Sequence, residues 1–147
     1  MLWVTRHRPH VDRCASAWLI KRFIDKEAVF EFVSKDSQIP KGAIGFTLPQ
    51  AEIHPIEGIK TTFDVLLERY NVKDSVLKKI QEIVRDYEFN EENLDNIQLK
   101  ETLGLCYVLK GLEETSQTDA ETIRKALTVM DALYATLKTH PINNPLS

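Results

Sequence analysis

Basic and imidazole side chains gather near the start of the chain, in residues 6–13, which we call the arginine turn. This turn contains Arg6, His7, Arg8, His10, Asp12 and Arg13. A planar guanidinium group binds a tetrahedral oxyanion through paired N–H donors, and the amino end of a helix adds backbone donors. The turn therefore predicts a site for a small anion. The alternative is that its arginines are solvated, or pair with Asp12 and Asp25.

A second hypothesis concerns a divalent metal ion bound by His54 and Asp64, with Asp12 as a further ligand. Histidine and carboxylate groups suit zinc, manganese or iron, and such a site would make the protein a metal-dependent enzyme. The chain lacks the His-x-x-x-His and Glu-x-x-His spacings that place paired ligands on one helical face. The ordinary alternative is that His54 is hydrogen-bonded at a strand end and Asp64 caps a helix with Thr61. Whether the protein is an enzyme is left open.

Asp131 is an unusual residue for its position, in the middle of an expected helix and beside the apolar stripe of that helix. Either it pairs with Arg13 or Arg22 of the N-terminal helix, or it faces a pocket. We therefore include it in the predicted ligand-binding set, which consists of Arg6, His7, His10, Asp12, Arg13 and Asp131.

The elements that position these residues begin with a strand and a helix. Residues 2–5 are a short apolar run typical of a strand, and the helix that follows the turn has a buried stripe that includes Trp18. Residues 28–33 predict a second strand, parallel to the first in a βαβ unit. Residues 43–48 and 51–54 are two shorter strand candidates.

Polar residues with capping chemistry mark the helices that follow Lys60. Thr61 or Thr62 begins the first of them, and Asp74 caps the next. Thr118 and Glu121 have the spacing of a capping box at the start of the last helix.

Residues 97–112 are apolar on nearly every side, so we expect the central helix there. Gly104 and Gly111 would let a neighbouring element approach closely. The last helix should end at Pro141, before a frayed tail. Together these elements predict an α/β fold: a small, mixed or mostly parallel sheet of three to four strands, one crossover helix and a C-terminal partial bundle of helices.

The composition fits one soluble domain over residues 1–147, with 43% hydrophobic and 28% charged residues. A net charge of -3 argues against a nucleic-acid-binding surface. Cys14 and Cys106 lie in apolar helical patterns, without disulfide or zinc spacing, which fits a reducing compartment. Arg6 comes too early for a secretory leader, and no apolar run is long enough to span a membrane. We therefore expect a cytoplasmic protein.

The opening of the chain resembles the signature of the C-terminal domain of ChrB-type chromate-resistance proteins. The matching segments are Trp3-Val-Thr-Arg6, Pro9-x-Val-Asp-Arg13 and Trp18-Leu-Ile-x-Arg-Phe-Ile-Asp25. Weaker matches follow at His54, Thr62-Phe-Asp64 and Asp131-Ala-Leu-Tyr134. The family often carries Cys-Pro directly before the tryptophan, whereas this chain has Ser16-Ala17.

The resemblance implies a domain associated with chromate resistance. Our first hypothesis is a stand-alone module that binds or senses a small anionic ligand, such as chromate or a similar oxyanion, at the arginine turn. In that family the domain often follows an N-terminal region associated with chromate-responsive transcription. Because this chain starts at the motif itself, we expect that it does not bind DNA alone. A bound divalent metal and a homodimer both stay open.

Overall fold

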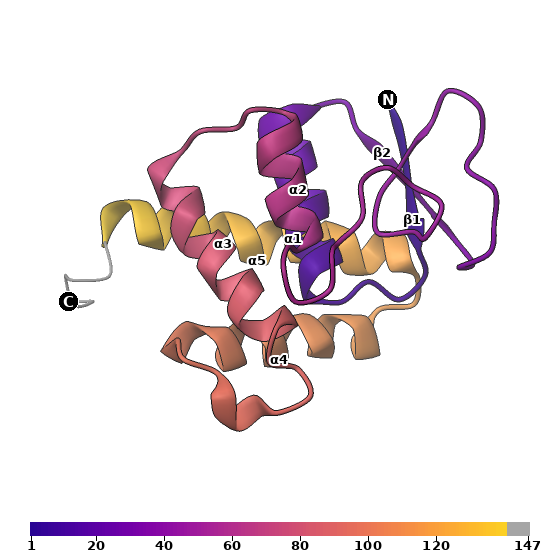
Figure 1. Cartoon of the computed structure of the whole chain (residues 1–147). Helices are drawn as coiled ribbons and strands as arrows, with labels where there is room; N and C mark the ends of the chain where they lie inside the picture. The colour runs from indigo at the N-terminus through magenta and orange to yellow at the C-terminus, as the bar shows by residue number, and fades with distance from the viewer. Residues whose placement is uncertain (141–147) are drawn as a thin grey trace.

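The computed structural model describes residues 1–140. Residues 141–147, which belong to the predicted domain and include the tail from Pro141, lie outside the described residues. The described part contains a three-stranded parallel sheet and five α-helices, with the sheet at one side of the helices (Figure 1). The predicted α/β class, with its small parallel sheet and its C-terminal helices, is confirmed.

The sheet has the strand order β2-β1-β3, so the first strand is the central one. β1 (Leu2–Arg6) pairs in parallel with β2 (Val29–Val33) on one side and with β3 (Ile44–Gly45) on the other. The chain therefore crosses over β1 between β2 and β3. Ligands of open α/β sheets bind outside the carboxyl ends of the strands at such a switch in strand order. The arginine turn begins at the carboxyl end of β1.

The two short strands expected after β2 are mostly loop. β3 covers only two residues, and Phe46 and Ile53 form an isolated bridge in place of a second strand. Thr47 ends the pairing because its φ of 55° lies in the left-handed region, and Pro49 cannot donate a ladder hydrogen bond.

The predicted helix caps at Thr61, Asp74 and Thr118 are confirmed, whereas the helix predicted over residues 97–112 begins at Lys100. The helices are α1 (Val11–Leu19), which continues as a π-helical turn η1 (Ile20–Ile24), α2 (Thr62–Arg69), α3 (Ser75–Glu88), α4 (Lys100–Thr115) and α5 (Asp119–Thr139), with a short 3₁₀ turn η2 (Leu94–Asn96) before α4. Thr61, Asp74 and Thr118 each accept a hydrogen bond from a backbone N–H in the first turn of α2, α3 and α5. Within residues 1–140, no helix combines the length and the apolar character needed to cross a bilayer.

The central helix is α1, which contacts α2, α3, α4 and α5. The expectation that residues 97–112 form the central helix is wrong, because only one stripe of α4 is buried, at Thr102, Cys106 and Leu109. Its opposite face leaves Tyr107 71% and Val108 50% exposed. No neighbour approaches the glycines of α4 either: a side-chain carbon added at Gly104 or Gly111 would meet nothing within 4 Å in the described chain.

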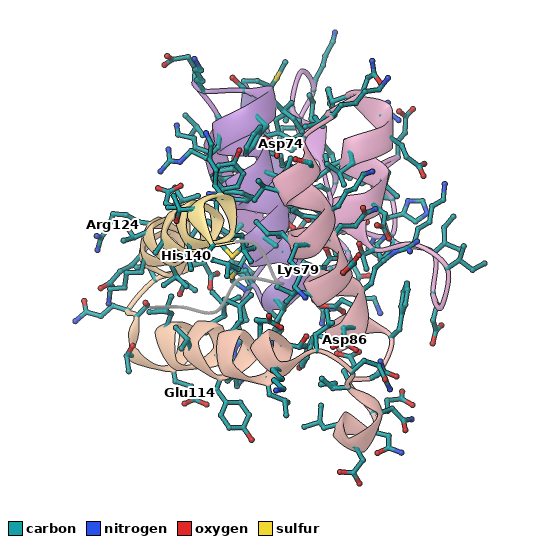
Figure 2. The ribbon with its side chains drawn as sticks, turned by 90° about the vertical axis from the view of Figure 1, so that its left-hand side faces the viewer. Asp74, Lys79, Asp86, Glu114, Arg124 and His140 are labelled. Atoms are coloured by element: carbon teal, nitrogen blue, oxygen red, sulfur yellow. The ribbon has the colours of Figure 1, made fainter. Side chains whose placement is uncertain are left out.

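Buried aspartates join one helix to the next. Asp86, near the end of α3, lies beside the chain that leads into α4 (Figure 2). Its carboxylate accepts hydrogen bonds from the backbone N–H of Gln98 and of Leu99, both at 2.9 Å, and from Thr102 Oγ1 at 2.7 Å. Asp86 therefore caps the amino end of α4, whose N-cap residue Leu99 has no side-chain acceptor.

Trp18 is 1% exposed, so the prediction that it lies in the core is confirmed. Its ring packs against Phe23 and Tyr134, with centroids 5.5 and 5.7 Å away. Its indole N–H donates to Asp131 Oδ1 at 2.8 Å, and Arg22 donates to both carboxylate oxygens of Asp131 at 3.0 Å. The partner of Asp131 is thus Arg22, one of the two predicted arginines, and Asp131 joins α5 to the N-terminal helix.

We predict that packing at Trp18 stabilises the fold more than the ion pair beside it. Trp18→Ala should cost about 3–5 kcal/mol, as large-to-small core changes do. Arg22→Gln should cost less than about 1 kcal/mol, because the side chains of Arg22 and Asp131 are 41% and 45% exposed. Urea unfolding of the two variants measures both costs, and equal losses would contradict this ranking.

Candidate functional site

The arginine turn connects the end of β1 to the start of α1 and is held together by Arg13. Arg13 Nη1 donates to the carbonyls of Arg6 and His7, at 2.6 and 2.9 Å, and Nη2 donates to the carbonyl of Arg8 at 2.8 Å. Arg8 has a φ of 59°, in the left-handed region that is unfavourable for a residue with a side chain. The hydrogen bonds from Arg13 help to hold the backbone in this conformation. Burial, followed by the charge of Arg6, lowers the pKa of Arg13. Three of its five donors therefore position the turn, and two remain.

Ion pairs tie the turn to the C-terminal helices. Glu113 accepts hydrogen bonds from Lys110 Nζ at 2.9 Å and from Arg8 Nε at 2.7 Å, and these bonds lower the pKa of Glu113 to about 2. Asp119 Oδ2 lies 2.9 Å from His7 Nδ1, and Oδ1 accepts from the backbone N–H of Arg8 at 3.1 Å. Arg8 and His7 are thus engaged with carboxylates of α4 and α5.

Asp12 connects α1 to α2. Its side chain is buried, with the residue 6% exposed. Oδ2 accepts from the backbone N–H of Thr62 at 2.8 Å, and Oδ1 accepts from Phe63 N–H at 3.1 Å and Ser16 Oγ at 3.2 Å. Burial raises the pKa of Asp12, and these hydrogen bonds act against that increase. Asp12 therefore caps α2 from the first turn of another helix.

Asp64 acts as the capping partner of Thr61. Its Oδ2 accepts from the Thr61 N–H at 2.8 Å, while the Thr61 hydroxyl accepts from the Asp64 N–H at 3.1 Å. Gln81 and Arg85 of α3 donate to the same carboxylate at 2.6 and 2.9 Å. The carboxylate is therefore surrounded by protein donors, which is the ordinary alternative that the sequence left open.

His54 is exposed, and its Nδ1 lies 2.6 Å from the carbonyl of Ala51. The structure does not assemble His54, Asp12 and Asp64 into one group. In residues 1–140, no three histidine, cysteine, aspartate or glutamate side chains are arranged to hold a metal ion.

A cleft of about 450 Å³ lies where the strand order switches. We call it the switch-point cleft; the arginine turn forms one wall, and residues 55–61 and the end of α3 form the others. Its basic and hydroxyl side chains are Arg6, His10, Arg13, Lys60, Thr47 and Thr61. Four residues of the predicted ligand-binding set, Arg6, His10, Asp12 and Arg13, line it together.

A second hollow, of about 680 Å³, lies on the β2 side of the same turn. This basic hollow shares Arg6, His10 and Arg13 with the cleft and adds His7, Arg8, Lys35 and Lys110. No carboxylate of the described chain lines it. Clustered positive charge raises the local concentration of anions near the turn. Asp131, His54 and Asp64 line neither the cleft nor this hollow.

The residue that sequence reasoning missed is Glu88, the last residue of α3. Its Oε1 accepts from the backbone N–H of Asp12 at 3.2 Å, in the first turn of α1 and 76 residues away in the chain. Burial, followed by the negative charge of Asp12, raises the pKa of Glu88 to about 8. One sequence signal was present: an acidic residue at the carboxyl end of a helix opposes the helix dipole.

Both cysteines are buried within the part of the chain that the structure describes. Burial raises the pKa of Cys14 and of Cys106 to about 12. A thiol with such a pKa is protonated at neutral pH, and the nucleophile is the thiolate. Neither cysteine is therefore a thiolate nucleophile at neutral pH, and neither lines the cleft.

These features define a small α/β domain with a charged cleft at the carboxyl end of its central strand. The chain belongs to the ChrB C-terminal domain family, whose model matches residues 3–137. Protein ChrB of Cupriavidus metallidurans is 32% identical to it over 133 residues, which are 90% of this chain and 39% of that protein. The chain thus spans about two fifths of this curated relative. No solved structure matches the chain.

We predict that the cap provided by Asp12 is essential for stability. Asp12→Ala should cost at least about 2 kcal/mol, because two buried N–H groups lose their acceptor at about 1–3 kcal/mol each. Asp36→Ala, at an exposed loop position, is the control and should stay within about 0.5 kcal/mol. Denaturant unfolding measures both variants. An Asp12→Ala protein as stable as Asp36→Ala would contradict the role of Asp12 as a cap.

Proposed function

We propose that this domain of the ChrB chromate-resistance family binds a small tetrahedral oxyanion, such as chromate, in the switch-point cleft. The observation that carries the proposal is that the Arg6 guanidinium has no carboxylate partner among the described residues. Within residues 1–140 its side chain takes part in no ion pair, although it lines both the cleft and the basic hollow. The two neighbouring arginines already have partners in the protein: Arg8 pairs with Glu113, and Arg13 binds the backbone carbonyls of the turn.

Several groups around Arg6 favour an anion, against the carboxylates of Asp12, Glu57, Glu88 and Glu91 that also line the cleft. The two guanidinium groups of Arg6 and Arg13 repel each other, and a bound oxyanion would relieve that repulsion. Arg13 still has two donors, and the start of α1 adds the positive end of the helix dipole. The basic hollow would attract the anion from solution, so affinity and association rate should both fall with added salt.

The test compares thermal unfolding in sulfate or chromate with unfolding in chloride at matched ionic strength. A ligand at a hundredfold excess over its dissociation constant should stabilise the wild-type protein by about 2.7 kcal/mol. Arg6→Ala should remove most of this stabilisation, because it removes a whole guanidinium group that forms no ion pair in the described chain, whereas Arg13 has only two donors left. Arg124→Ala is the matched control, since Arg124 projects outward from α5, and it should respond like the wild type (Figure 2).

Two results would contradict the proposal. One is an Arg6→Ala protein that sulfate and chromate stabilise as much as they stabilise the wild type. The other is a wild-type protein that responds to these oxyanions no more than to chloride.

A further inference from the structure

The carboxyl group of Glu88 occupies a place that suits an anionic ligand. It lines the switch-point cleft and accepts a hydrogen bond from the first turn of α1, where backbone donors would otherwise face the ligand. The N-cap residue of α1, His10, supplies no side-chain acceptor of its own. An oxyanion that reaches Arg6 and the amino end of α1 therefore comes close to Glu88.

Titratable and charged groups face Glu88 from several elements: Asp12 and Arg13 on α1, Glu91 on the segment after α3, Cys106 on α4 and Tyr87 on α3 itself. Across the cleft lie Arg6, His10, Lys60 and Glu57. Asp12 is committed to the cap of α2, and Arg13 to the carbonyls of the turn. Burial raises the pKa values of Cys106 and Tyr87 and lowers that of His10, so these three groups stay uncharged near pH 8.

A dianion next to the two carboxylates of Asp12 and Glu88 would be strongly repelled in this half-buried place. One proton between Glu88 and the ligand converts the repulsion into a charge-assisted hydrogen bond. The proton can come from either side: a protonated Glu88 donates to the anion, or an anion that carries hydrogen donates to the Glu88 carboxylate.

We propose that Glu88 determines the ligand specificity of the switch-point cleft, which binds an oxyanion only together with one proton held between Glu88 and the anion. This inference rests on the proposed anion-binding function. Sulfate and chromate bring no proton at alkaline pH, so Glu88 must carry it for them. Hydrogenphosphate brings its own.

The pKa of Glu88 is raised to about 8. Above this pH, anions without a proton, such as sulfate, should bind more weakly than anions that carry one, such as hydrogenphosphate. Near pH 7 the carboxyl group holds a proton, and both classes should bind. Near pH 9 it has lost the proton, so sulfate affinity should fall about tenfold for each pH unit above the pKa. Hydrogenphosphate still carries one proton there and should keep its affinity.

Isothermal titration of sulfate and of inorganic phosphate, near pH 7 and pH 9, tests the inference. In the wild type, phosphate should bind about tenfold more tightly than sulfate near pH 9, and the difference should largely disappear near pH 7. Glu88→Gln should lose this preference because its amide cannot ionise. Glu27→Gln, which changes an exposed carboxylate outside the cleft, should behave like the wild type.

A second measurement needs no variant. Sulfate titrations near pH 9 in two buffers of different ionisation enthalpy report the protons bound with the anion, and the wild type should take up close to one. Sulfate binding without proton uptake, or an unchanged preference in Glu88→Gln, would overturn the role of Glu88 and leave the anion site intact. If neither anion binds the wild type at either pH, the proposed function itself fails and this inference fails with it.

Discussion

The structure depends on one buried carboxylate, that of Asp12. It lies in the first turn of α1 and satisfies the free N–H groups at the start of α2, so it fixes the arginine turn against residues 55–61. Burying a charge is costly unless hydrogen bonds surround it, and here backbone donors at a helix amino end supply them. The two walls of the cleft therefore come from segments about fifty residues apart and are held in place before any ligand arrives.

Other aspartates also connect neighbouring helices through hydrogen bonds. Asp86 caps α4 from α3, and Asp64 joins α2 to α3 through Arg85. Asp131 joins α5 to Trp18 and Arg22. Each aspartate uses its short side chain to bind donors of a neighbouring element. Glu113 of α4 also pairs with Arg8, so α4 helps to hold the arginine turn, in which Arg13 binds the carbonyl of Arg6.

Local patterns in the sequence were sufficient to predict β1, α1 and the caps at Thr61, Asp74 and Thr118, since each depends on residues a few positions apart. Of the long-range roles, the pairing of Asp131 with Arg22 was among the predicted alternatives, and the others were not predictable in this way. Nothing local distinguishes Arg13, which holds the turn, from Arg6, which lines the cleft without an ion pair in the described chain. Glu88 reaches the site from 76 residues away. The exposed face of α4 was mistaken for core because apolar character alone does not show which side finds a partner.

The most direct measurement is a crystal structure of the protein soaked in selenate near neutral pH, with anomalous scattering used to locate selenium. Selenate has the shape and charge of sulfate and chromate. Our account predicts a selenium peak in the switch-point cleft, with selenate oxygens within hydrogen-bond distance of the Arg6 guanidinium and beside Glu88. Selenate found only in the basic hollow, or in neither place, would contradict it.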